Sequence, residues 1–298
     1  MTTAMTDLPT SQNPALDAFE ASVEHHYAHN GDVRIHYTAT GSGPLLVFLH
    51  GFPDHWLGWW QVMASLRNEY RTIAIDLRGY NLSDQPKDAQ AYAAEHIVAD
   101  VRAVIEDQGA SSATIIGHDW GGFMAWHVAM DAPELVDGLV VLNMPHPWAI
   151  ARELGTNPAQ REASEYVRMF RQREAHLHFP QARLSAWVAD FGFKARQEQA
   201  MARSSLDGML NYYRVNWPVE PYQVRSDQPP HVKAPTLLIH GLNDPYALPA
   251  GLNDIWQWID NELEIYTLPG AEHFIQHENA PQVVQRLRQW LGQRIQRG

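Results

Sequence analysis

The sequence of 298 residues contains no cysteine. Disulfide bonds, thiolate nucleophiles and metal sites built on cysteine are therefore excluded, and this absence favours a cytoplasmic protein. Basic residues are also scarce, with 22 Lys and Arg against 34 Asp and Glu and a net charge of −12. Because nucleic-acid binding requires clustered positive charge, we expect no nucleic-acid partner.

Long apolar runs are missing as well. No segment approaches the roughly 20 apolar residues that a membrane-spanning helix needs, and residues 1–20 lack the basic and apolar regions of a signal peptide. We therefore expect a soluble monomer or homodimer without a membrane partner, in which residues 1–20 form a mobile leader. The apolar content of 45% is typical of a globular chain with a sizeable core.

What the sequence does contain is an alternation of strand-like and helix-like segments. This pattern predicts an α/β fold with a mostly parallel central sheet flanked by helices. A helix is expected between residues 92 and 109, and another at the C-terminus. The predicted strands cover residues 33–41, 44–52, 71–79, 112–117, 135–144, 235–241 and 263–270.

The alternation stops in the middle of the chain, where residues 145–230 are helix-prone and show no strand pattern. We therefore predict one core domain, residues 21–144 and 231–298, interrupted by a helical cap of residues 145–230. Open α/β sheets bind ligands at the carboxyl ends of their strands. The cap is expected to cover that edge.

The segment GHDWGG (117–122) lies between a predicted strand and a predicted helix. Small residues two positions before and after Asp119 permit the strained backbone and close packing of a nucleophile elbow. This arrangement places the carboxylate at the amino end of a helix, where negative charge is favoured. The alternative is that Asp119 only caps the helix, but a cap does not need glycines on both sides.

Two further residues follow in the chain order expected for such an elbow, which is nucleophile, acid, histidine. Asp244 and His273 each come directly after a predicted strand. We predict that Asp244 orients His273, with His277 as the weaker alternative. The same fold builds an oxyanion hole from backbone N–H groups, which in this chain would be those of Phe52 and Trp120.

An aspartate at the elbow favours alkyl transfer over acyl transfer. With an ordinary pKa near 3.9 it is already ionised at neutral pH and can attack saturated carbon. A serine would form an ether there, whereas Asp119 forms an ester of the protein. Water activated by His273 can attack the carbonyl of that ester. The sequence therefore argues against an esterase or a lipase.

Three segments resemble motifs of the epoxide hydrolases of the α/β-hydrolase fold: HGFPDHWLGW (50–59), DLRGYNLSD (76–84) and GHDWGG (117–122). The resemblance covers nearly everything after the first 20 residues. It implies an α/β-hydrolase fold and the conversion of an epoxide and water to a vicinal diol through an ester on Asp119. It also implies a small apolar epoxide as substrate and no metal or organic cofactor.

The resemblance also points to two tyrosines in the cap. An epoxide oxygen leaves as an alkoxide, whose conjugate acid has a pKa near 16, so it needs a proton donor such as tyrosine. The segments ASEYVRMFRQ (163–172) and MLNYYRVNWP (209–218) match those that carry these tyrosines in the family. They map the two donors onto Tyr166 and Tyr213, with Tyr212 as the alternative to Tyr213.

Other proteins with the same elbow fit less well. Fluoroacetate dehalogenases place arginine where this chain has Trp120 and Phe123. Haloalkane dehalogenases keep the tryptophan, but many carry asparagine in place of Phe52, and paired cap tyrosines are not part of their pattern. A non-catalytic binding protein of this fold usually keeps a serine at the elbow. A haloalkane or haloacetate dehalogenase is the main alternative, and a binding protein the second.

Aromatic residues predict an apolar substrate pocket. Its candidates are Phe52, Trp120, Phe123 and Trp148, with Trp187 and Trp217 as further possibilities. The histidine clusters at 25–29 and 176–178 are weak metal signals. We expect solvated histidines there and no metal site.

Overall fold

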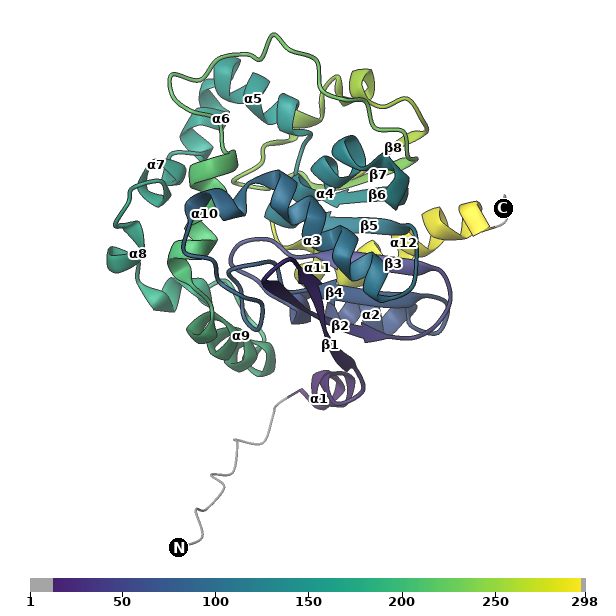
Figure 1. The fold of residues 1–298 in the computed structure, drawn as a ribbon. Coiled ribbons are helices and arrows are strands. Elements are labelled where there is room, and N and C mark those ends of the chain that lie inside the picture. Colours follow the sequence, from purple (N-terminus) through teal and green to yellow (C-terminus); the bar gives the residue numbers. More distant parts are fainter. Residues whose placement is uncertain (1–12, 296–298) are drawn as a thin grey trace, which may run out of the picture.

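A computed structural model describes residues 13–295, and an eight-stranded sheet forms its centre (Figure 1). The order across the sheet is β1-β2-β4-β3-β5-β6-β7-β8; β2 runs antiparallel to both neighbours and the other pairs are parallel. This confirms the α/β-hydrolase fold. The strands are β1 (Glu24–Asn30), β2 (Val33–Thr40), β3 (Leu45–Leu49), β4 (Arg71–Ile75), β5 (Ala113–His118), β6 (Val136–Leu142), β7 (Thr236–Gly241) and β8 (Leu263–Leu268).

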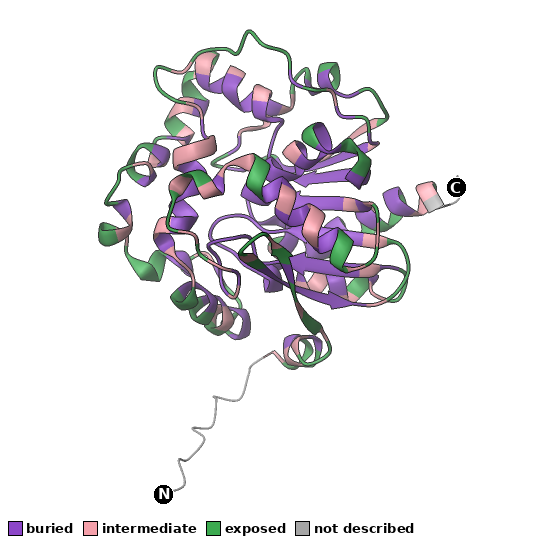
Figure 2. Cartoon of the chain, in the orientation of Figure 1, coloured by how far each residue is buried: buried purple, intermediate pink, exposed green. Residues whose placement is uncertain are grey.

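Helices cover both faces of the sheet, which is why its central strands are continuous apolar runs. Helices α3 (Ala94–Asp107) and α4 (Trp120–Asp131) pack on one face, and α2 (Trp60–Leu66) and α12 (Ala280–Ile295) on the other. The central strands of the sheet are buried, whereas the edge strands β1 and β8 are mostly exposed or half-buried, as are the outer sides of the helices (Figure 2).

The segment between β6 and β7 is helical, as the sequence predicts. It packs against the loop that follows β3, because Gln197 Nε2 donates to the carbonyl of Pro53 and the ring of Tyr213 lies 5.7 Å from that of Phe52. In Figure 1 it forms a layer beside one end of the sheet. Its helices are α5 (Pro147–Thr156), α6 (Pro158–Ala163), α7 (Tyr166–Phe170), α8 (Ala175–His178), α9 (Phe191–Arg203) and α10 (Leu206–Asn216).

The N-terminal region differs from the prediction. Residues 1–12 of the expected leader lie outside the described part, but Pro14–Glu20 form helix α1, so a leader extending to residue 20 is wrong. Leu16 and Phe19 of α1 are buried, and the side chain of Asp17 pairs with Arg196 of α9 at 2.5 Å. Strand β1 was also not predicted, because its sequence EHHYAHN is mostly polar.

Within residues 13–295, no helix combines the length and the apolar character needed to span a membrane.

Candidate active site

Asp119 stands at the sharp turn between β5 and α4, with a backbone φ of 51° and ψ of −121°. A Cβ atom on Gly117 would lie 2.2 Å from the carbonyl oxygen of Gly121, and one on Gly121 would lie 2.1 Å from that of Leu49. Only glycine fits such contacts, so these residues allow β5, α4 and β3 to approach closely. The Asp119 side chain makes no capping hydrogen bond to α4, which argues against the simple N-cap.

The loop after β3 reaches the carboxylate. The backbone N–H of Phe52 donates to Asp119 Oδ1 at 2.7 Å. The approach is tight, since a Cβ on Gly51 would lie 2.4 Å from the Cβ of Asp119. Burial raises the pKa of Asp119, but His273 and the Phe52 amide outweigh it and hold that pKa below its ordinary value. Asp119 is therefore ionised at neutral pH.

Asp244 and His273 lie after β7 and β8, and the fold brings them together. His273 Nδ1 lies 2.8 Å from Asp244 Oδ2. Asn143 donates to the same oxygen at 2.6 Å, while the backbone amides of Tyr246 and Ala247 donate to Oδ1 at 2.8 and 3.1 Å. These donors fix Asp244. Despite its burial, His273 and then the side chain of Asn143 hold the pKa of Asp244 well below its usual range.

His273 faces Asp119 with its other nitrogen, at 3.5 Å from Oδ2. Burial lowers the pKa of His273, but the carboxylates of Asp244 and Asp119 outweigh it and raise the pKa to about 10. The alternative histidine, His277, binds Asp54 instead, at 2.9 Å. The structure thus brings together Asp119, His273 and Asp244, and it places His277 in a separate pair.

A cavity of about 430 Å³ opens above Asp119. Tyr166 of α7 and Tyr213 of α10 both line it, with ring centroids 6.0 Å apart. Tyr212 is turned away, because its hydroxyl donates to the carbonyl of Arg78 at 3.0 Å. The other lining residues are Phe52, Pro53, Asp119, Met169, Phe170, Phe179, Arg183, Ala186, Trp187, Tyr246, His273 and Phe274.

Tyr166 and Tyr213 keep their protons. Burial raises the pKa of Tyr166 well above 10, and the nearby negative charge of Asp119 adds to this effect. The pKa of Tyr213 is raised in the same way, by burial first and then by the neighbouring Tyr166 and Asp119. The neutral hydroxyl groups of Tyr166 and Tyr213 and the carboxylate of Asp119 therefore belong to the same cavity.

Comparisons with known proteins show the family of this chain. A family model described as alpha/beta hydrolase fold matches residues 44–280. Epoxide hydrolase 3 of Xenopus tropicalis is 30% identical, over 95% of this chain and 82% of that protein. Epoxide hydrolase 1 of Caenorhabditis elegans is 32% identical, over 87% and 68%. The crystal structure of Bacillus megaterium epoxide hydrolase with an inhibitor superposes with a TM-score of 0.82 at 33% identity, over 90% of this chain and all of that one.

The chain belongs to the epoxide hydrolase family. It is an enzyme of the α/β-hydrolase fold, as the resemblance of its motifs implies.

Three of the four pocket residues predicted for this epoxide hydrolase lie elsewhere. The Trp120 ring is buried behind Tyr213, with centroids 4.8 Å apart. Phe123 lines a neighbouring cavity of about 610 Å³. Trp148 donates to the carbonyl of Asp227 and stacks under Arg225, with the guanidinium 3.8 Å from the ring centroid. Of the predicted set, only Phe52 lines the cavity, and Trp187 does so among the further candidates.

The cavity of this epoxide hydrolase contains residues that the sequence did not single out. Tyr246 packs against His273 and Tyr166, at 5.0 and 5.6 Å between ring centroids. The one feature of the sequence that could have indicated a place for Tyr246 in the cavity is its position two residues after Asp244. Phe274 follows His273 directly and stacks on Trp187 at 3.9 Å. Within residues 13–295, no cluster of three or more His, Asp or Glu residues is suited to a metal ion.

Proposed function

We propose that this enzyme converts an epoxide and water to a vicinal diol through a covalent ester on Asp119, hydrolysed by water that His273 activates. One observation carries the proposal: the ionised carboxylate of Asp119 and the protonated hydroxyl groups of Tyr166 and Tyr213 line the same cavity. Helices α5 to α10, which supply both tyrosines, act as the cap.

In the first step, Asp119 Oδ2 attacks a ring carbon of the epoxide. A new carbon–oxygen bond forms as the ring carbon–oxygen bond breaks, and the leaving oxygen takes a proton from Tyr166 or Tyr213. Because burial keeps both phenols protonated, a donor is present throughout the neutral range. Phe52 holds Oδ1 during the attack, which leaves Oδ2 as the nucleophilic oxygen.

In the second step, His273 takes a proton from water, and the hydroxide attacks Cγ of Asp119. The oxyanion forms on Oδ1, where the amide of Phe52 donates, with the amide of Trp120 as the second donor. The bond between Cγ and Oδ2 then breaks, Oδ2 takes the proton that His273 removed from water, and the diol leaves with Oδ2. Esterification removes the charge of Asp119 and thereby lowers the pKa of His273. Its resting proton neutralises the tyrosinate left by the first step, and the neutral imidazole can then act as the base.

The presence of Tyr166 and Tyr213 favours epoxide opening over dehalogenation. A halide leaves as a stable anion and needs only donor dipoles, whereas an alkoxide needs a proton. The apolar walls of the cavity, among them Phe52, Phe170 and Phe274, suit a small apolar epoxide.

A single turnover in heavy-oxygen water tests the proposal. The first diol molecule should carry no label, because its new oxygen comes from Asp119, and the label should instead be found in Asp119 by peptide mass analysis. Label in the first diol would mean direct hydration and would refute the ester. A parallel panel of styrene oxide, an aliphatic epoxide, a bromoalkane and fluoroacetate should show turnover of the epoxides, and turnover of the halides alone would favour the dehalogenase.

A further inference from the structure

Helix α1 contacts both the core and the cap. Its apolar residues Leu16 and Phe19 are buried and belong to the apolar cluster on the α2 side of the sheet. The Phe19 ring lies 6.3 Å from that of Trp60 on α2. The apolar side of α1 is therefore fixed to the core.

The polar side of α1 faces helix α9 of the cap. Arg196 of α9 binds two carboxylates of α1, with Nη2 2.5 Å from Asp17 Oδ1 and Nε 3.1 Å from Glu20 Oε2. The two N-cap residues are also joined, because Asn13 of α1 donates to Asp190 of α9 at 3.1 Å. Residues three and four positions apart share one face of a helix, so the three polar residues of α1 form a single stripe. This stripe holds α9 at its N-cap and again at Arg196.

The segment that leads into α9 forms part of the cavity wall. Trp187 lines the cavity and stacks on Phe274, with ring centroids 3.9 Å apart. Phe274 directly follows His273 in the chain. Val188, next to Trp187, is buried in the same apolar cluster as α1. A displacement of the start of α9 would therefore move the wall of the cavity.

The next turn of α9 is attached directly to the core. Gln197 is buried, its Nε2 donates to the carbonyl of Pro53, and its Oε1 lies 2.9 Å from His55 Nδ1. The ion pairs of Arg196 with α1 are in contrast partly exposed. Partly exposed ion pairs are weak, whereas breaking a buried hydrogen bond leaves polar groups unsatisfied. The attachment through α1 is therefore the one that opens more easily.

We propose that α1 is a clamp that holds the start of α9, and with it Trp187, in a closed position. Arg196 is the positioning residue through which the clamp acts. When its ion pairs open, the start of α9 moves away from the core and the cavity widens beside Trp187. A bulky epoxide enters in this open state, whereas a small epoxide also enters in the closed state. The kinetic part of this proposal rests on the proposed function, and the movement of α9 does not.

The kinetic test compares trans-stilbene oxide, a bulky epoxide, with 1,2-epoxybutane, a small one. In Arg196→Gln, the ratio of kcat/KM for the bulky over the small epoxide should rise about two- to thirtyfold, because two exposed ion pairs contribute about 0.2–1 kcal/mol each and apparent affinity follows the fraction of open molecules. The change should lie in KM for trans-stilbene oxide and not in kcat, because the reacting groups are unaltered. Arg196→Lys should restore part of the wild-type ratio. An unchanged or lower ratio in Arg196→Gln overturns the proposal.

A double-mutant cycle shows whether Arg196 acts through α1. Asp17→Asn combined with Glu20→Gln removes the same ion pairs from the other side, and it should raise the ratio as much as Arg196→Gln does. Combining all three substitutions should add little, because each removes the same interaction. Additive effects would mean that Arg196 acts independently of α1, which contradicts the clamp.

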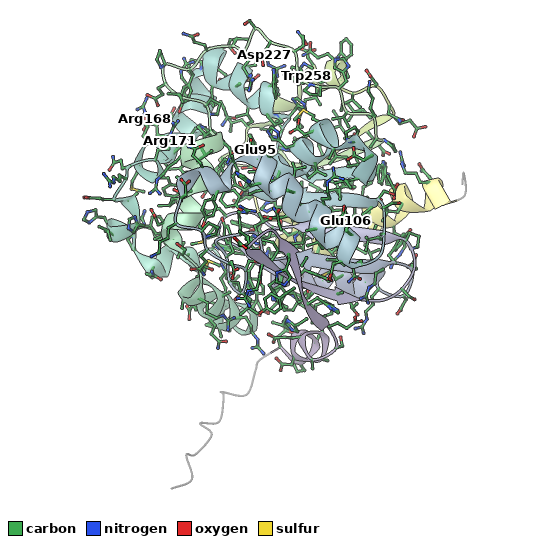
Figure 3. All side chains as sticks on the ribbon, viewed as in Figure 1. Glu95, Glu106, Arg168, Arg171, Asp227 and Trp258 are labelled. Carbon is green, nitrogen blue, oxygen red and sulfur yellow. The ribbon has the colours of Figure 1, made fainter. Side chains whose placement is uncertain are left out.

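Arg168→Gln is the matched control. Like Arg196, Arg168 pairs with two carboxylates, but these belong to Glu220 and Glu165 of the cap itself. In Figure 3, Arg168 is labelled at the left and lies well away from the purple helix α1 at the bottom of the view. This variant should keep the wild-type ratio. An equal rise in Arg168→Gln would mean that any lost charge loosens the cap, and it would refute the specific role of α1.

Hydrogen exchange, measured by mass spectrometry, tests the movement without turnover. The amides of Phe193 and Lys194 donate to Asp190 at the start of α9. They should exchange about two- to thirtyfold faster in Arg196→Gln and in the Asp17→Asn/Glu20→Gln variant, while the amides of α3, on the other face of the sheet, should exchange as in the wild type. Unchanged exchange at α9 would refute the clamp, and epoxide turnover in the same preparation would then leave the proposed function intact.

Discussion

His273 Nε2 lies 3.5 Å from Asp119 Oδ2, longer than the roughly 2.7–3.2 Å of an ordinary hydrogen bond. The two groups therefore interact mainly through their charges, in a buried site where screening is weak. The charge of Asp119 helps to keep His273 protonated in the resting enzyme. In the proposed mechanism, loss of that charge on esterification changes His273 from an acid into a base.

The raised pKa of His273 predicts how stability depends on pH. Folding raises this pKa from 6.5 to about 10, so the native state binds the proton more tightly. The resulting stabilisation is complete below about pH 6.5 and is lost as the pH rises through about 10. We expect urea denaturation to show a free energy of unfolding that falls over this range in the wild type. The fall should be smaller in His273→Gln, and equal falls in both would contradict the raised pKa.

Replacing His273 with glutamine should stop the reaction at the ester. After incubation with an epoxide, the intact mass should increase by the mass of one substrate molecule, because no base activates water. His277→Gln is the matched control, since His277 pairs with Asp54 and not with Asp119. It should accumulate no adduct. Normal turnover in His273→Gln would remove this residue from the mechanism.

The role of Tyr166 and Tyr213 as proton donors can be tested with Tyr212 as the control. Tyr166→Phe combined with Tyr213→Phe should slow ester formation by about 10²–10⁴-fold, measured by rapid quenching, because no proton reaches the leaving oxygen. Tyr212→Phe removes only the hydrogen bond to the carbonyl of Arg78. It should cost about 0.5–1.5 kcal/mol of stability and leave ester formation intact. The opposite outcome would assign the donor role to Tyr212.

The close contacts at the elbow predict a large effect of one methyl group. Gly117→Ala would place a Cβ 2.2 Å from the carbonyl oxygen of Gly121, which should cost about 3 kcal/mol or more. Gly292→Ala in α12 meets no atom within 4 Å and should stabilise the protein by about 0.5–1 kcal/mol. Chemical denaturation measures both. A similar effect of the two substitutions would show that β5 and α4 are not in tight contact.

Much of the fold could be predicted because its signals are local. The strands β3, β5, β6 and β7 are apolar runs, since helices cover both faces of the sheet. Six residues, 117–122, specify the elbow. They place a carboxylate at its tip and glycines at the positions where the backbones touch. Strand β1 was not predicted, because it pairs on one side only and its polar sequence contains no apolar run.

The sequence alone determined the elbow and the order of Asp119, Asp244 and His273, because parallel strands bring the residues that follow them to one edge of the sheet. The tertiary structure decided which side chains reach the cavity. Tyr212 and Tyr213 are adjacent on α10, and only the packing of that helix turns one toward Arg78 and the other toward Asp119. The packing of α5 likewise turns Trp148 away from the cavity, and no pattern along the sequence predicts the orientation of that helix.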